Sequence, residues 1–275
     1  MVKKVFFLGF SKKNPDTGSM SPLIKKHYCS SQFEEALSLT EAKPSWDALQ
    51  KKVPNFPRGF FELCNLELSD RIEFFKEYWL KTLPYAPKAS PRIETFFQKI
   101  EDIGVYVVKT KEREGYNIEF VYSISQQNCF FRGGPPLTEE EINSKNHQFN
   151  YVLPKDYLSF FQIHNGFARH NDIGIICLEQ VKACQEKLFQ RLEGKGPQFS
   201  SSFFYERDSL IPFYECFGLH SYQCFFKEWR PTPEMGNVYF SGVDYTISDT
   251  SKKEEDLAFE TFLDWLVFYL EGRET

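Results

Sequence analysis

An α+β fold is predicted from three patterns in this chain of 275 residues. Apolar side chains recur at helical spacing in several segments, most clearly over 90–103 and 256–270. Apolar and polar residues alternate over 116–124, which is typical of a half-buried strand in an antiparallel hairpin. Short strand-like segments then follow one another between glycine and proline turns. We therefore expect an antiparallel sheet packed with helices, preceded by a helix-rich N-terminal region.

The first ninety residues are expected to be separate from a domain over 91–275. Residues 5–10 have the apolar content of a buried strand, and 12–22 have the proline, glycine and serine content of a loop. A helix is expected over 69–82, because this segment has one apolar face and is followed by two prolines. No internal repeat is present.

A second helix is expected to begin at Ser90, where a serine N-cap precedes a proline in the first helical position. Its apolar residues recur at helical spacing as far as Ile103, and Gly104 is expected to end it. Two strands and a linker are then expected, at 105–110, 116–124 and 131–136.

A capping box is expected at the sequence TEEE. The Thr138 hydroxyl and the Glu141 carboxylate can each accept a hydrogen bond from the other's backbone N–H at the start of a helix. Glu139 and Glu140 lie beside them, at the positive end of the same helix dipole. These carboxylates therefore have a structural explanation, and we expect no catalytic or metal-binding role for them.

The stretch LPKDYLSFFQIHNGF, residues 153–167, raises the question of a reactive histidine. Pro154 is expected to start a short helix, and Asn165-Gly166 to end it with a positive φ. His164 is then a last-turn residue beside the helix's C-terminal carbonyls. The buried face of this helix is expected to consist of Tyr157, Leu158 and Phe161.

The C-terminal part is expected to alternate strands, loops and helices. Strands are expected at 173–178, 211–216, 221–229 and 237–241. Helices are expected at 181–192 and 256–270, with a loop at 194–202. Gly272 is expected to end the last helix.

Motifs for nucleophilic or nucleotide chemistry are absent from the sequence: it has no G-x-S-x-G, no S-x-x-K, no phosphate-binding glycine loop and no CxxC pair. One weak metal-site alternative is the loop carrying His164, His170 and Asp172, although we favour His170 and Asp172 as exposed loop residues. Cys177 lies among apolar residues and is expected to be an inert, buried thiol. We expect no cofactor, no metal and no catalytic residue.

Charge is unevenly distributed along the chain. Residues 1–133 hold 20 basic and 16 acidic side chains, whereas 134–275 hold 13 and 22, which gives net charges of +4 and −9. An acidic second half argues against nucleic-acid binding, because phosphate contacts need clustered cations. Seven cysteines without paired spacing indicate a reducing compartment, and no apolar run is long enough for a membrane helix. A cytoplasmic location is therefore expected.

Five motifs occur in an order that resembles the SUKH superfamily, which includes Smi/Knr-type regulators of fungal cell-wall synthesis and bacterial immunity proteins. They are TEEEI at 138–142, LPKDYLSFFQIHNG at 153–166, IPF at 211–213, GNVYF at 236–240 and FETFLDWL at 259–266. The resemblance covers the second half of the chain, from residue 134. It implies a single α+β domain. The residues that match the family and would define this fold are Thr138, Glu141, Leu153, Pro154, Tyr157, Phe161, Asn165, Gly166, Ile211 and Pro212.

The resemblance also implies a function without catalysis, namely binding to another protein. Our leading expectation is an immunity protein that neutralises a basic toxin domain, and the alternative is a regulatory scaffold that uses both halves of the chain. The remote alternative is a metal-dependent enzyme at the histidine loop. The candidate partner-binding residues are Glu215, Asp244, Tyr245 and Asp249.

The sequence departs from the family pattern in two places. After the IPF motif, Gly218 is followed by Leu219 and His220 rather than by an aspartate. After GNVYF, the chain continues with residues 242–245, Gly-Val-Asp-Tyr, where the family often has an acidic residue and a histidine. These departures put in doubt a surface at the end of the sheet and, with it, a family-typical partner.

Overall fold

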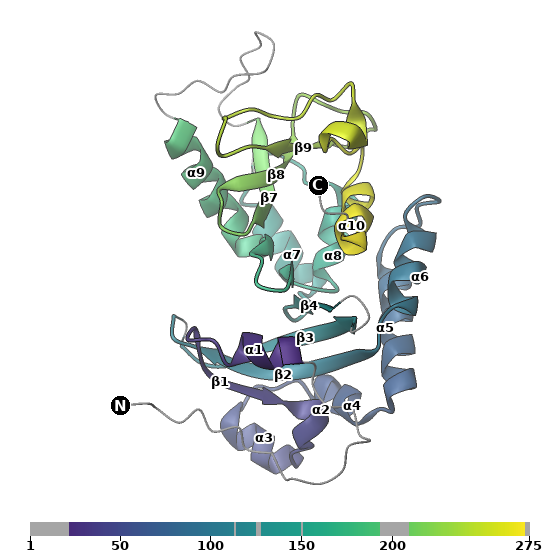
Figure 1. Cartoon of the computed structure of the whole chain (residues 1–275), viewed down its shortest axis with the longest axis vertical. Helices are drawn as coiled ribbons and strands as arrows, with labels where there is room; N and C mark the ends of the chain where they lie inside the picture. The colour runs from purple at the N-terminus through teal and green to yellow at the C-terminus, as the bar shows by residue number, and fades with distance from the viewer. Residues whose placement is uncertain (1–21, 113, 125–127, 150, 193–208, 273–275) are drawn as a thin grey trace. The chain divides into compact units, whose positions relative to one another are not determined.

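A computed structural model describes residues 22–112, 114–124, 128–149, 151–192 and 209–272 (Figure 1). Contacts between residues divide the chain into two compact units, which are described separately. Unit 1 comprises 1–77 and 97–135, and unit 2 comprises 78–96 and 136–275. Contact-based units need not coincide with independently folding domains, so the division expected at residue 90 stays a prediction.

The described residues of unit 1 combine the antiparallel strands β1 to β4 with short helices, which confirms the helix-rich N-terminal region. Each strand pairs with the next in the sequence. The strands are β1 (Phe33–Ser38), β2 (Asp102–Thr110), β3 (Asn117–Ile124) and β4 (Cys129–Gly133). The helices are α1 (Pro22–Tyr28), α2 (Leu39–Ala42), α3 (Trp46–Lys52), α4 (Arg58–Asn65) and the first part of α5 (Leu68–Thr82), the helix expected over 69–82.

The helix that begins at Ser90 is shorter than expected. Helix α6 spans Ser90–Gln98, and the chain enters β2 at Asp102, where Ile103 pairs with Tyr122 of β3. The prediction that Gly104 ends the helix is wrong, because this glycine lies inside β2. A Cβ at Gly104 would lie 2.7 Å from the Tyr106 ring, so the glycine leaves space for that ring. The helical spacing of Ile100 and Ile103 therefore extends past the end of the helix, because Ile103 already lies in β2.

Strand β3 is buried on both faces in its second half, so the half-buried strand expected there is only partly right. Val121 and Tyr122, which point to opposite faces, are 1% and 0% exposed. The linker expected over 131–136 is wrong for its first three residues, because β4 pairs with β3 through Phe131 and Tyr122. One face of this sheet packs against α1 in a cluster of Ile24, Tyr28, Phe33, Tyr106, Val108, Val121 and Phe130.

Unit 2 holds a second set of antiparallel strands, each paired with the next, together with helices. The strands are β5 (Phe167–Arg169), β6 (Gly174–Ile175), β7 (Leu210–Cys216), β8 (Ser221–Phe226) and β9 (Asn237–Phe240). The helices are α7 (Glu139–Asn146), α8 (Lys155–Phe161), α9 (Val181–Leu192) and α10 (Phe262–Glu271), with 3₁₀ turns η2 (Leu178–Gln180) and η3 (Lys253–Asp256). An α+β fold of antiparallel strands and helices is thereby confirmed.

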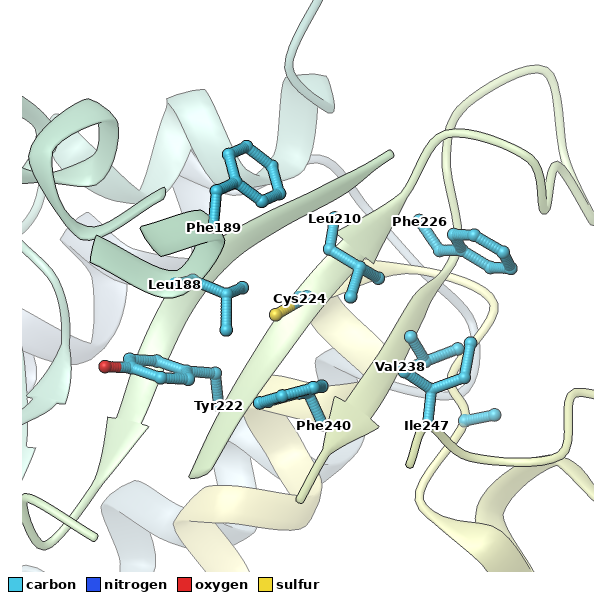
Figure 2. Close-up of a cluster of buried hydrophobic side chains, with 10 residues drawn as sticks. Leu188, Phe189, Leu210, Tyr222, Cys224, Phe226, Val238, Phe240 and Ile247 are labelled. Carbon is cyan, nitrogen blue, oxygen red and sulfur yellow. The ribbon is translucent and has the colours of Figure 1, made fainter. Parts of the chain in front are cut away.

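The strands β7 to β9 are covered by helices on both faces. On the face that carries Cys224 of β8, which is 0% exposed, Leu188 and Phe189 of α9 lie beside the strands (Figure 2). On the opposite face, the Phe225 ring lies 5.0 Å from Tyr157 of α8 and 4.4 Å from Phe213 of β7. Phe213 in turn contacts α10 at Phe262 and Trp265. Alternate residues of one strand therefore serve two different apolar layers.

Helix ends in unit 2 follow their capping residues. The capping box of α7 is confirmed, since Thr138 and Glu141 accept from each other's backbone N–H. Helix α10 ends at Gly272 with a φ of 62°, as expected. Its start is six residues later than expected, because Phe259 pairs with Asn237 as a β-bridge and Thr261 caps the helix.

The remaining segments agree with the predictions made from the sequence to different extents. Helix 181–192 and the strands near 211–216 and 237–241 are confirmed. The strands expected at 173–178 and 221–229 are shorter, ending at Ile175 and Phe226. Residues 5–10, the loop at 194–202 and nearly all of the loop at 12–22 lie outside the described residues.

Candidate functional site

His164 belongs to an aromatic core, and it lies beyond the helix that was expected to contain it. Helix α8 ends at Phe161, and the His164 N–H donates to the Phe160 carbonyl at 2.9 Å in the turn that follows. The imidazole is 0% exposed and stacks on Phe167 at 5.4 Å, with the Trp79 ring 5.9 Å away. The His164 side chain therefore fills the core and does not face solvent.

The histidine loop does not assemble a metal site. Asp172 is 1% exposed, so the expectation of an exposed loop residue is wrong for it. Its carboxylate accepts hydrogen bonds from Phe217 N, Tyr214 Oη and Tyr269 Oη, whereas His164 packs among aromatic rings. Across the part of the chain that the structure describes, no three His, Cys, Asp or Glu side chains are grouped to hold a metal ion.

Exposed apolar side chains gather at one end of the sheet in unit 2, and we call them the sheet-end surface. They are Ile173, Phe217, Leu219 and Val243, which are 46%, 58%, 64% and 78% exposed. Phe217 and Leu219 lie in the turn between β7 and β8, Ile173 directly precedes β6, and Val243 follows β9. Exposed apolar residues that cluster in this way, unlike scattered ones, are typical of binding surfaces.

Hydrogen bonds and one close backbone approach connect these three segments. The Phe217 N–H donates to Asp172 Oδ1 at 2.7 Å, which connects the β7–β8 turn to the segment before β6. A Cβ at Gly242 would lie 2.3 Å from the His220 carbonyl oxygen. The Gly242 N–H also donates to Ser221 Oγ at 3.1 Å. The loop after β9 is therefore fixed against the β7–β8 turn, and only glycine fits at Gly242.

The β7–β8 turn carries unusual residues for its backbone conformation. Phe217 and Gly218 have φ values of 46° and 70°, and the Leu219 N–H donates to the Cys216 carbonyl at 2.9 Å. These features fit a type I′ turn, whose first central position favours asparagine, aspartate or glycine. A phenylalanine there costs about 1–2 kcal/mol of backbone strain, and its ring is largely in solvent. Local stability therefore does not explain Phe217, and strain of this kind is common at functional sites.

Three of the four candidate partner-binding residues lie at this end of the sheet. Asp244 is exposed beside Val243, and Tyr245 has a φ of 59° with its ring against Phe240. Glu215 lies in β7 with its side chain only 13% exposed and 3.6 Å from His220 Nδ1. Asp249 lies beyond the Phe240–Ile247 bridge from these residues, and its carboxylate accepts from Ser251, which lowers its pKa.

The two departures from the family pattern include Leu219 and Val243 of this surface, but the candidate partner-binding residues expected from the sequence were acidic residues and Tyr245, and none of the four exposed apolar residues was among them. The departures, at 218–220 and 242–245, do lie side by side. The missed signal was the sequence Phe-Gly-Leu in a strand connection, where polar residues are usual. Ile173 gave no such signal, because it was expected to lie in a strand.

Residues 136–267 match the family model described as the SMI1 / KNR4 family (SUKH-1). The C-terminal half of the chain is a SUKH domain. The resemblance drawn from the five motifs is thereby confirmed, and the matched residues include the whole sheet-end surface. A search of curated proteins finds no match to this chain. Among the described residues, no helix has the length and apolar character needed to cross a membrane.

The motif residues of the SUKH domain lie mainly in its core. Leu153, Tyr157, Phe161 and Ile211 are all 0% exposed. Pro154 is the N-cap residue of α8, and Pro212 lies next to an irregularity in the pairing of β7 with β8, where a missing N–H is tolerated.

The Asn165-Gly166 pair of the SUKH domain joins α8 to β5. The Asn165 Oδ1 accepts from Leu178 N at 2.9 Å, and its Nδ2 donates to Glu179 Oε2 at 3.0 Å. Gly166 has a φ of 87°, and a Cβ there would lie 2.8 Å from Cys177 Sγ. The pair therefore turns the chain into β5 four residues after α8 has ended, so the expectation that it ends the helix is wrong.

Proposed function

We propose that the SUKH domain binds another protein, without catalysis, through the sheet-end surface. The observation that carries this proposal is the set of four exposed apolar side chains on three segments that contact one another. Burying them would contribute favourable free energy to association, at roughly 25 cal/mol for each Å² of apolar surface removed from water. Because the surrounding backbone is fixed by glycine contacts and hydrogen bonds, little ordering would be needed on binding.

Charge supports a basic partner. Residues 134–275 hold 13 basic and 22 acidic side chains, and Asp244 lies exposed at the rim of the surface. Complementary charge speeds association and favours the correct partner over others. Within this proposal, the role closest to the family is that of an immunity protein, whose partner is a basic toxin domain. All seven cysteines are free thiols, which fits action in a reducing cytoplasm.

Leu219→Lys and Val243→Lys are expected to weaken partner binding at least tenfold, because each places a cation in the apolar centre. Val152→Lys is the matched control, since Val152 is 79% exposed and Val243 is 78% exposed. All three variants should unfold at the wild-type temperature, because their side chains are in solvent. The measurement is affinity capture with the full chain at low salt, followed by calorimetric titration of the purified captured protein.

The matched control decides how these results are interpreted. A captured protein that binds Leu219→Lys and Val243→Lys as tightly as the wild type would contradict the proposed surface. If Val152→Lys weakened binding equally, the effect would come from added positive charge. Binding to a basic partner should also weaken as the ionic strength rises, and binding that ignores salt would exclude the electrostatic contribution.

The scaffold alternative requires a second partner on unit 1. Leu66, Leu68 and Phe74 are 37%, 43% and 44% exposed there, and they lie close together in the sequence. We expect Phe74→Lys to keep every protein that the sheet-end surface captures. If Phe74→Lys instead lost one captured protein that Leu219→Lys retains, the scaffold role would be favoured over the immunity role.

A further inference from the structure

Asp172 is a buried carboxylate with no part in the apolar surface itself, yet it contacts the turn that carries this surface. It is 1% exposed, and its Oδ1 accepts the Phe217 N–H at 2.7 Å. Its Oδ2 accepts from Tyr214 Oη at 2.8 Å and from Tyr269 Oη at 3.3 Å. Burial is the main cause that raises the pKa of Tyr214, so this phenol stays protonated and donates to Asp172.

The same network ties the turn to the last helix. Tyr269 of α10 accepts the Arg169 N–H at 2.7 Å with the oxygen that contacts Asp172. The Asp172 N–H donates to the Arg169 carbonyl at 2.9 Å, which closes the turn between β5 and β6. The Phe217 amide is therefore bonded to a carboxylate whose own position is fixed from β5, β7 and α10.

Phe217 needs such a partner because its backbone conformation is unfavourable. A non-glycine residue with a positive φ persists only where its surroundings hold it. The hydrogen bond that the Phe217 N–H donates to Asp172 Oδ1 holds the residue in this conformation and so offsets the strain. Without it, the turn would populate conformations in which Phe217 and Leu219 point elsewhere.

We infer that Asp172 is a positioning residue for partner binding, because it holds the β7–β8 turn in the conformation that presents Phe217 and Leu219. This inference rests on the proposed function of the sheet-end surface. If only a fraction of the molecules has the turn in the conformation that binds the partner, the apparent affinity is reduced by that fraction. Loss of Asp172 should then slow association with the partner and leave dissociation nearly unchanged.

Asp172→Ala is the test variant, and three further variants accompany it. Asp172→Asn keeps an oxygen that can accept the Phe217 N–H, so it should restore the turn. Tyr214→Phe removes another hydrogen bond of the same buried carboxylate but leaves the Phe217 bond in place, so it reports general destabilisation. Phe217→Asn places a residue suited to a type I′ turn at this position. Phe217→Asn should keep or raise the unfolding temperature, but it should weaken partner binding because the phenyl ring is missing.

The first measurement needs no partner. In the wild-type protein, amide hydrogen exchange should be slower at Phe217 than at Gly218 of the same turn. In Asp172→Ala, exchange at Phe217 and Leu219 should accelerate at least tenfold beyond the change seen in Tyr214→Phe. Equal exchange rates at Phe217 and Gly218 in the wild type would overturn the inference even if Asp172→Ala failed to fold.

The second measurement uses the protein captured by the wild-type chain. Its association rate with Asp172→Ala should fall about tenfold, with recovery in Asp172→Asn. If the turn exchanges faster but the association rate is that of the wild type, the positioning role is wrong while the proposed function stands. If Leu219→Lys binds normally, the proposed function itself fails, and the inference fails with it.

Discussion

Trp79→Ala is expected to lower the free energy of unfolding by about 3–5 kcal/mol, the usual cost of removing a buried tryptophan. The indole is 0% exposed and lies against Phe160, Phe167 and His164, at ring distances of 5.5, 5.6 and 5.9 Å. Urea unfolding of the full chain measures the change. Tyr85→Ala is the control, because Tyr85 is 79% exposed and its loss should change stability by less than about 0.5 kcal/mol.

The expected effect of Trp79→Ala also determines where a shortened chain that contains the SUKH domain can begin. Trp79 precedes the family match at residue 136, yet it packs with residues of 153–167 in unit 2. A chain shortened to begin after residue 90 would lack the indole and leave the same cavity. Partner-binding tests on such a fragment would therefore confuse lost stability with lost binding. A destabilisation by Trp79→Ala of less than about 1.5 kcal/mol would contradict this placement.

Asp156→Ala is expected to destabilise the protein more at acid pH than at neutral pH. Asp156 is 7% exposed; its Oδ1 accepts Tyr157 N at 2.8 Å, and its Oδ2 accepts Leu263 N at 3.0 Å at the start of α10. Burial is the largest cause that raises the pKa of Asp156 to about 6, and Glu234 raises it further, while the backbone hydrogen bonds act in the opposite direction.

The sign of the pH dependence follows from this raised pKa. Between about pH 4 and pH 6 the folded state binds a proton that the unfolded state has released, so wild-type stability falls as the pH rises through this window. We expect Asp156→Ala to cost about 1–2 kcal/mol at pH 7, because the backbone N–H groups of Tyr157 and Leu263 both lose their acceptor. At pH 4.5 the cost should be larger by about 2 kcal/mol.

Urea unfolding at both pH values checks this expectation. Asp156→Asn cannot titrate, so its difference from the wild type should show the same slope with pH, whatever its size. A cost that grows toward neutral pH would mean that the Asp156 carboxyl has a lowered pKa, as an ordinary exposed helix cap has.

The sequence correctly predicted helix ends that depend only on neighbouring residues. The capping box at Thr138 and the glycine after α10 were both correct, because each depends on a few neighbouring residues. Ile103 was misplaced, because its helical spacing from Phe96 and Ile100 competed with pairing to Tyr122, a partner 19 positions away. The start of α10 was misplaced for the same reason, since Phe259 pairs with Asn237. Long-range pairing thus overrides local periodicity.

The candidate site was harder to predict, because its parts come from segments far apart in the chain. Asp172 looked like an exposed loop residue, and only the fold brings Tyr214, Phe217 and Tyr269 to it. The negative charge of residues 134–275 predicted a basic partner, but it gave no location for a binding surface. The motif residues were a good guide to the core, where matching residues such as Tyr157 are fully buried.

The Asn165-Gly166 turn also has a consequence for the chemical durability of the protein. An asparagine followed by glycine is prone to ageing, because the glycine amide nitrogen can attack the side-chain carbonyl carbon and expel ammonia. That attack requires the Asn165 side chain to rotate toward its own backbone. Here both ends of the amide are occupied, one by the Leu178 N–H and the other by the Glu179 carboxylate. The hydrogen bonds that shape this turn therefore also protect it from deamidation.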